Sequence, residues 1–150
     1  MTTFASISEL TGAVGTHLGY SDWLEITQER INDFAEATDD HQWIHVDPVL
    51  AASGPFGTTI AHGYLTLSLA VRFVAELFEV QGVSMGVNYG TNKVRFVSPV
   101  PVGSKLRAGA LLAAVDEIGG GVQATLDLTF EVEGSEKPAC VAQVVYRMYA

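Results

Sequence analysis

The sequence predicts an α+β fold in which an antiparallel sheet of five to six strands wraps around one central helix. Between His62 and Val80, apolar residues cover nearly the whole helical circumference and leave only a narrow polar stripe, so this helix must be enclosed on most sides. From Val122 to Val132, apolar and polar residues alternate, which is typical of a strand with one buried face. Glycine-rich turns at 119–121 and 134–135 favour antiparallel pairing of the flanking strands.

Two shorter helices are expected before the central one. A helical period runs from about Gln28 to Ala37, and Thr27 is a suitable N-cap. Residues 39–46 show no period. Asp47 followed by Pro48 then supplies an N-cap and a proline in the first helical position, which predicts one or two turns through Ala52. The segment 53–57 breaks this helix, and no repeat or linker divides the chain.

The part of the chain after the central helix is expected to form the sheet. The predicted strands are Ser84–Tyr89, Asn92–Ser98, Ser104–Glu117, Val122–Glu133 and Pro138–Tyr149. Cys140 shares a strand face with apolar residues, so we expect it in the core rather than as a nucleophile.

Length and composition limit the kind of protein. A chain of 150 residues with 48% apolar residues fits a single globular domain spanning residues 1–150. Its formal net charge of −9 argues against binding to nucleic acid or to an anionic membrane surface. The single cysteine excludes an intrachain disulfide and a zinc site with several cysteines. Because no signal peptide or membrane span is predicted, we expect a cytoplasmic protein.

The segment Asp39–Asp47 contains three acidic residues and two histidines in irregular backbone. One interpretation is a solvated loop with an aspartate capping a helix end. A second is a metal site formed by His41, His45 and Asp47, although the i, i+4 spacing aligns the two imidazoles only on a helix. A third is a general acid/base pair in which a carboxylate and an imidazole hold one water molecule.

The dipeptide His62-Gly63 stands at the start of the central helix. Gly63 then lies in the first turn, where backbone N–H groups lack intrahelical partners and the helix dipole favours negative charge. A glycine at this position either allows a ligand close to the backbone or simply eases the junction between loop and helix. A histidine in the position of His62 is more often a structural loop residue than a catalyst.

Four cations, half of the Lys and Arg in the chain, lie on two predicted strands. Lys93 and Arg95 share one strand face, and Lys105 and Arg107 share a face of the next strand. They form either a solvated surface paired with acids such as Asp127 or an anchor for a phosphate-bearing cofactor.

Motifs in this chain resemble the MaoC-like hydratase family, the (R)-specific enoyl-CoA hydratases of the hot dog fold. That family has Asp, any residue, Asn, Pro, an aliphatic residue and His, and segment 40–45 here reads Asp-His-Gln-Trp-Ile-His. The Asn-Pro pair is replaced by Gln42 and Trp43. Segment 61–65, Ala-His-Gly-Tyr-Leu, resembles the start of the family's central helix, and segment 89–100 resembles its characteristic strand. Fingerprints of serine hydrolases, phosphate-loop enzymes and dinucleotide-binding folds are absent.

The resemblance implies reversible hydration of trans-2-enoyl-CoA to (3R)-hydroxyacyl-CoA by a single hot dog domain. Asp40 and His45 would activate water and return a proton to C2, while the Gly63 N–H would stabilise the enolate-like oxygen. Substrate would contact four further residues, which are His62, Tyr64, Lys93 and Arg95. The implied chemistry requires no metal or redox cofactor, coenzyme A being part of the substrate. Single hot dog chains of this family pair into homodimers.

Other activities fit the same fold. A hot dog thioesterase would direct water at the thioester carbon instead of C3. A non-catalytic acyl-thioester binder or dehydratase partner subunit would not need both Asp40 and His45. A dehydratase acting on acyl carrier protein would use the same chemistry on a different carrier.

Overall fold

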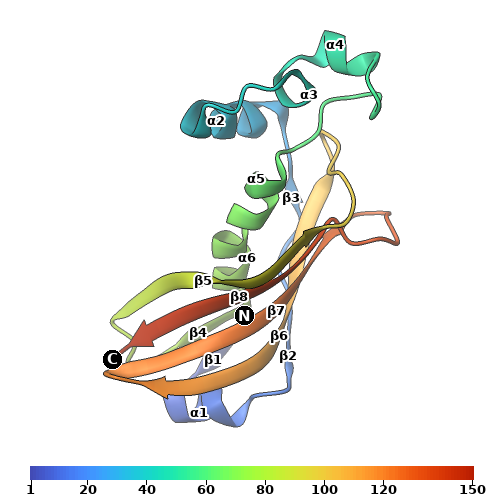
Figure 1. The fold of residues 1–150 in the computed structure, drawn as a ribbon. Coiled ribbons are helices and arrows are strands. Elements are labelled where there is room, and N and C mark those ends of the chain that lie inside the picture. The colour runs from blue at the N-terminus through green and yellow to red at the C-terminus, as the bar shows by residue number, and fades with distance from the viewer.

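The computed structural model describes residues 1–150 and has an antiparallel sheet curved around a helix (Figure 1). The sheet order is β2-β6-β7-β8-β5, and β3 also pairs with β6. The strands are β2 (His17–Tyr20), β3 (Leu24–Glu25), β5 (Met85–Phe96), β6 (Lys105–Ile118), β7 (Gly121–Val132) and β8 (Cys140–Tyr149). The predicted α+β architecture is therefore confirmed.

The central helix consists of α5 (Gly63–Ser68) and α6 (Ala70–Leu77). Hydrogen bonds from Leu69 N to Leu65 O (3.1 Å) and from Phe73 N to Leu69 O (3.0 Å) run across the joint, so the two segments act as one rod. Phe73 is fully buried and packs against Phe130 of the sheet, with ring centroids 6.1 Å apart. No helix in the structure combines the length and apolar character needed to cross a bilayer.

The helix ends earlier than its apolar pattern predicts. Residues 78–80 form β4 (Phe78–Val80), which pairs in parallel with β1 (Thr2–Phe4) at the start of the chain. An apolar run alone does not distinguish a buried helix from a buried strand. The short helix α1 (Ile7–Gly12) and strands β1 to β3 were also not predicted, because elements of two to six residues have little periodicity.

Three helices form a layer over the N-terminal end of α5 (Figure 1). They are α2 (Gln28–Thr38), α3 (Trp43–Val46) and α4 (Pro48–Ala52). Both predicted caps are present, since Thr27 Oγ1 accepts from Arg30 N (3.2 Å) and Asp47 Oδ1 accepts from Leu50 N (2.9 Å). Trp43 lies so close to Gly54 that a Cβ there would be 2.8 Å from the indole.

One prediction about the sheet is corrected by the pairing pattern. The strands expected at 84–89 and 92–98 form the single strand β5, which crosses residues 89–92 by two register shifts against β8. Strands β5 and β6 are not neighbours, because β8 and β7 lie between them. Cys140 is fully buried as predicted, and desolvation raises the pKa of its thiol to about 11.

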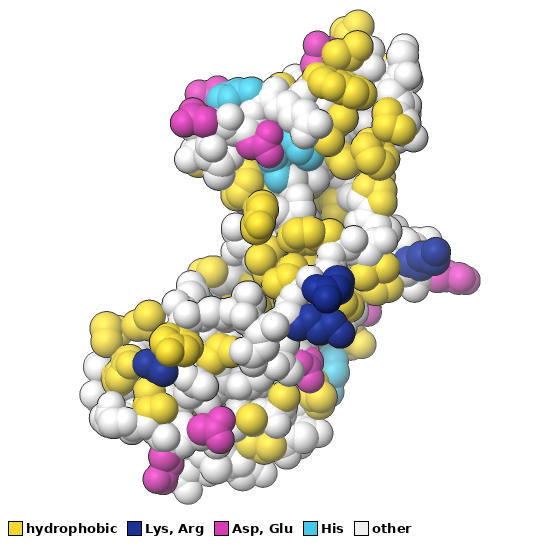
Figure 2. Space-filling view, viewed as in Figure 1, with side chains coloured by type: hydrophobic (Ala, Val, Ile, Leu, Met, Phe, Trp, Pro, Cys, Tyr) yellow, Lys and Arg dark blue, Asp and Glu magenta, His cyan; other side chains and the backbone are white.

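Strand β5 forms one edge of the sheet, and every residue in it except Val94 is exposed. Large apolar side chains nearby are exposed as well, namely Tyr64, Val71, Val87, Tyr89, Phe96 and Val97. Figure 2 shows apolar side chains gathered where the molecule narrows between the α2–α4 layer and the sheet. A long open edge beside an apolar surface favours association.

Candidate active site

Asp40 lies two residues after the last residue of α2. The helix ends because Asp39 adopts the left-handed conformation, with φ of 59°, and the chain then turns towards the central helix. The Asp40 carboxylate accepts a hydrogen bond from Gln42 N at 3.3 Å, which keeps it at the start of the turn leading to α3. Its side chain is half exposed, so one carboxylate oxygen remains open to a ligand or water.

His45 lies in α3 and is buried. Its Nδ1 lies 2.7 Å from the carbonyl oxygen of Ile60. Because a carbonyl can only accept, Nδ1 carries the proton, and the Nε2 of the neutral ring has a free lone pair. This tautomer is the one that a general base needs.

His62 is also buried, and its ring stacks on that of His45 with centroids 3.9 Å apart. His62 Nε2 donates to the Asp40 carbonyl at 3.0 Å and lies 4.0 Å from the Asp40 carboxylate. Desolvation lowers the pKa of His62, so the neutral ring is favoured. The buried Nδ1 atom of His62 has no hydrogen-bond partner.

One side-chain nitrogen or oxygen atom from each of Asp40, His45 and His62 lies within 4.8 Å of the other two. The set His41, His45 and Asp47 that the sequence suggested as a metal site is not assembled. His41 Nε2 instead contacts the Glu36 carboxylate at 2.7 Å, which raises the pKa of that imidazole. Asp47 is used as the cap of α4.

The backbone at the start of α5 has hydrogen-bond donors without partners in the helix. The first helical turn begins with the bond from Leu65 N to His62 O (3.0 Å), so the N–H groups of Gly63 and Tyr64 have no acceptor within the helix. A Cβ at Gly63 would lie 3.0 Å from the ring of Phe96. The absence of a side chain at Gly63 therefore lets the Phe96 ring of β5 pack closely against the start of the helix. Tyr64 is exposed and meets Phe96 edge-on, with centroids 5.9 Å apart.

A half-buried amide, that of Gln28, connects the segments that carry the cluster. Gln28 Nε2 donates to the carbonyl of His45 at 2.7 Å, and Gln28 Oε1 accepts from the hydroxyl of Thr59 at 2.6 Å. Thr59 precedes Ile60, whose carbonyl holds the His45 ring. Sequence reasoning did not identify Gln28, because nothing local marks the first residue of α2 as a partner of a loop 31 residues away.

The four cations proposed as one cluster separate into two pairs. Arg107 binds Glu131 on the neighbouring strand at 2.8 Å, and Lys105 lies 3.7 Å from Glu133. Lys93 and Arg95 have no acidic partner. They alternate with Val94, which packs against the core, so they project from the other face of β5.

Comparison with known proteins identifies the family. The model of the MaoC like domain matches residues 9–132. The chain belongs to the MaoC-like family. A curated MaoC-like relative, 3-hydroxyacyl-thioester dehydratase Z of Mycobacterium tuberculosis, is 57% identical over the full length of both chains. Together these matches establish that the chain is an enzyme of the MaoC hydratase and dehydratase type.

Solved structures of MaoC-like proteins share the hot dog fold seen here. An (R)-hydratase from A. caviae involved in PHA biosynthesis has a TM-score of 0.73 and 25% identity, covering 89% of this chain and 94% of its own. A monoamine oxidase regulatory protein from Archaeoglobus has a TM-score of 0.80 and 22% identity, covering 98% and 95%. The second likeness concerns the fold alone.

Proposed function

We propose that this MaoC-like enzyme hydrates trans-2-enoyl-CoA reversibly to (3R)-hydroxyacyl-CoA. The observation that carries the proposal is the convergence of an open carboxylate, Asp40, and a buried imidazole with a free Nε2, His45, beside the first N–H groups of the central helix. The name of the Mycobacterium tuberculosis relative, a 3-hydroxyacyl-thioester dehydratase, fits the reverse direction of the same reaction.

The site supports each step of that reaction. Asp40 and His45 hold one water molecule, and the dyad takes its proton as the water oxygen bonds to C3. The electron pair of the double bond moves towards the thioester carbonyl, and C2 then receives a proton from the dyad on the same face. Acid/base assistance of this kind contributes a factor of roughly 10² to 10⁴ in rate.

The N–H of Gly63 is the proposed oxyanion donor. It points from the start of a helix, where both unpaired donors and the helix dipole favour developing negative charge. Losing one such donor typically costs about 3 kcal/mol in activation free energy. No step of this mechanism draws on a metal ion or a redox cofactor.

The decisive experiment follows both possible fates of the thioester. Purified enzyme is incubated with crotonyl-CoA, longer enoyl-CoA and the matching enoyl thioesters of acyl carrier protein, and the products are resolved by chirality. We expect the (3R)-hydroxyacyl product without release of free thiol. Thiol release in place of hydration would instead identify a thioesterase, and absence of any product would leave only a binding role.

We further propose that the enzyme is a two-fold homodimer joined along β5. The exposed edge and the apolar side chains beside it support this assembly. The interface should bury well over ~1,000 Å², the area expected of a stable complex. Sedimentation as a fully active monomer at micromolar concentration would contradict the proposal.

A further inference from the structure

A groove runs along the side of the central helix that faces β5. Gly63, Thr66, Leu67, Ala70 and Val71 follow the i, i+3, i+4 spacing and form one helical face. A hollow of about 280 Å³ contacts Gly63 and Thr66, and a second of about 320 Å³ contacts the other three. The two hollows thus follow each other along the helix, and we call them together the helix–β5 groove.

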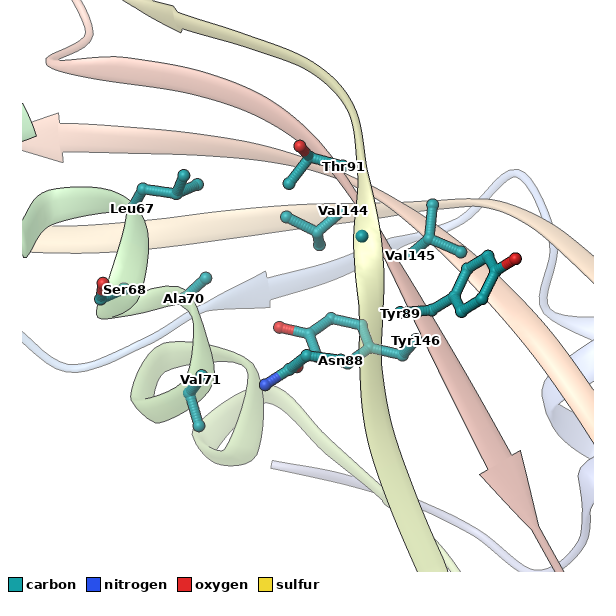
Figure 3. A pocket seen from close by; sticks show the side chains of 11 residues that line it. Leu67, Ser68, Ala70, Val71, Asn88, Tyr89, Thr91, Val144, Val145 and Tyr146 are labelled. Atoms are coloured by element: carbon teal, nitrogen blue, oxygen red, sulfur yellow. The ribbon is translucent and has the colours of Figure 1, made fainter. Parts of the chain in front are cut away.

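The far end of the groove is polar. Asn88 of β5 and Tyr146 of β8 are cross-strand partners, and Figure 3 shows both side chains directed towards the helix beside Ala70 and Val71. Neighbouring positions on this face of β8 are apolar, as Val144 and Met148 illustrate. Asn88 and Tyr146 therefore form a polar cross-strand pair at this end of the groove, and Thr91, the partner of Val144, is a further polar residue in the same hollow.

Neither polar group is used by the protein itself. The Tyr146 hydroxyl and the Asn88 amide make no hydrogen bond to another residue, whereas the neighbouring Ser68 hydroxyl is satisfied by the Tyr64 carbonyl at 2.6 Å. Burial raises the pKa of Tyr146 to about 12, so the hydroxyl remains a neutral donor. Pockets that are mostly apolar use a few such groups to select the ligand.

We propose that the helix–β5 groove selects acyl chains that carry a hydroxyl or keto oxygen near their distal end. This inference rests on the proposed function, because it places the thioester carbonyl at Gly63. Val71 is eight residues further along the helix, so the polar pair lies roughly 12 Å from that carbonyl at 1.5 Å per residue. An oxygen on a medium-length chain would reach Tyr146 and Asn88.

The energetic reason for selection is the unpaired state of these groups. A plain alkyl chain filling the groove displaces water from the hydroxyl and the amide and offers no hydrogen bond in return. A chain with a distal oxygen restores the pairing. A site that hydrogen-bonds a substrate oxygen strongly rejects an analogue without that oxygen. An apolar pocket rejects an analogue with an additional oxygen much more weakly.

The test compares trans-2-decenoyl-CoA with ω-hydroxy-trans-2-decenoyl-CoA. We expect wild-type kcat/KM to favour the hydroxylated substrate by about tenfold or more, since one good hydrogen bond is worth a factor of this order. Tyr146→Phe removes only the hydroxyl, and Asn88→Leu removes only the amide, and each should bring the ratio close to one. Tyr149→Phe, on the opposite face of β8, should leave the ratio unchanged.

A binding measurement separates this inference from the proposed reaction. Calorimetric titration with decanoyl-CoA and ω-hydroxydecanoyl-CoA needs no turnover, and the same preference should appear in Kd. Equal affinities of the wild type for both ligands would overturn the inference even if crotonyl-CoA is hydrated. The inference would also be overturned if the Tyr146→Phe and Asn88→Leu variants dissociate into monomers and keep the wild-type ratio of kcat/KM for the two substrates. Tyr146 and Asn88 would then stabilise the dimer interface instead of binding the substrate.

Discussion

Two polar regions of this enzyme differ in how completely their groups are paired. On the outer face of the sheet, Arg107 binds Glu131 at 2.8 Å and Gln143 donates to Asp127 at 2.7 Å. Around the start of α5, by contrast, the buried Nδ1 of His62 has no partner, and one nitrogen of His45 is free.

The difference distinguishes groups that stabilise the fold from groups that are available to a ligand. Cross-strand pairs are complete without a ligand, so they contribute to stability alone. The groups near α5 are desolvated but incompletely paired, which costs stability unless a reacting molecule completes them. Variants in the two regions should accordingly affect different measurements, turnover in one case and unfolding in the other.

The largest contrast is expected for the dyad. Asp40→Asn and His45→Gln should each lower kcat by about a hundredfold or more, the usual loss when acid/base catalysis is removed. Steady-state hydration of crotonyl-CoA measures the effect, and thermal unfolding should change little. Asp127→Asn, a carboxylate paired on the outer face, is the matched control and should keep normal turnover. Near-normal kcat in either dyad variant would contradict the mechanism.

A smaller effect on turnover is expected for Gln28. Gln28→Ala removes the donor to the His45 carbonyl and the acceptor of the Thr59 hydroxyl, so the His45 ring loses its fixed position against Ile60. We expect kcat to fall by roughly tenfold with KM little changed, as for an interaction that matters in the transition state. Asn32→Ala removes only the outer partner of Gln28 and serves as control. Equal losses in both variants would indicate general destabilisation.

The two pairs of cations should respond in opposite ways. Lys93→Ala or Arg95→Ala should raise KM for enoyl-CoA severalfold at low salt and weaken its salt dependence, because unpaired cations are free to hold phosphates. Arg107→Ala removes the Glu131 pair and contacts with the rings of Tyr20 and Trp23, and should lower Tm by a few degrees, about 1 kcal/mol. An unchanged KM with reduced stability in the Lys93 variant would assign it a structural role.

The smallest effect concerns the pH dependence of stability. Because burial lowers the pKa of His62 below its ordinary 6.5, the unfolded chain binds a proton more readily, and stability falls as pH drops below about that value. His62→Gln should reduce this loss, by at most about 1.4 kcal/mol per pH unit.

His41 supplies a control of opposite sign. Its pKa is raised by Glu36, so its stabilising contribution is present at low pH and disappears as pH rises through the raised pKa. Tm measured from pH 5 to pH 8 for the His62→Gln and His41→Gln variants would reveal the contrast. Parallel shifts in both variants would contradict it.

The sequence was sufficient for features with local causes. Thr27 and Asp47 cap the helices that follow them, and alternating residues identify the long strands. Asp40 and His45 could be paired in advance only through the resemblance to the family motif, in which the two residues stand five positions apart. The cap position of Asp47 was likewise evident from the sequence, and a carboxylate that caps a helix is not free to bind a metal ion.

Features that depend on distant segments could not be predicted. Whether Arg107 has a partner depends on the register of β6 against β7, and the separation of Lys93 from Lys105 depends on the order of strands in the sheet. The stacking of His62 on His45 joins two segments 17 positions apart through tertiary packing. Spacing along the chain contains no information about such contacts.

The two tryptophans happen to lie one in each of the regions compared above. Trp43 belongs to α3, stands two positions before His45 and packs on Gly54. Trp23 lies against Arg107 on the sheet. Replacing Trp23 by Phe would therefore leave Trp43 as the single tryptophan, close to His45 in α3. Its emission would report ligand arrival and loop rearrangement directly, without any attached label.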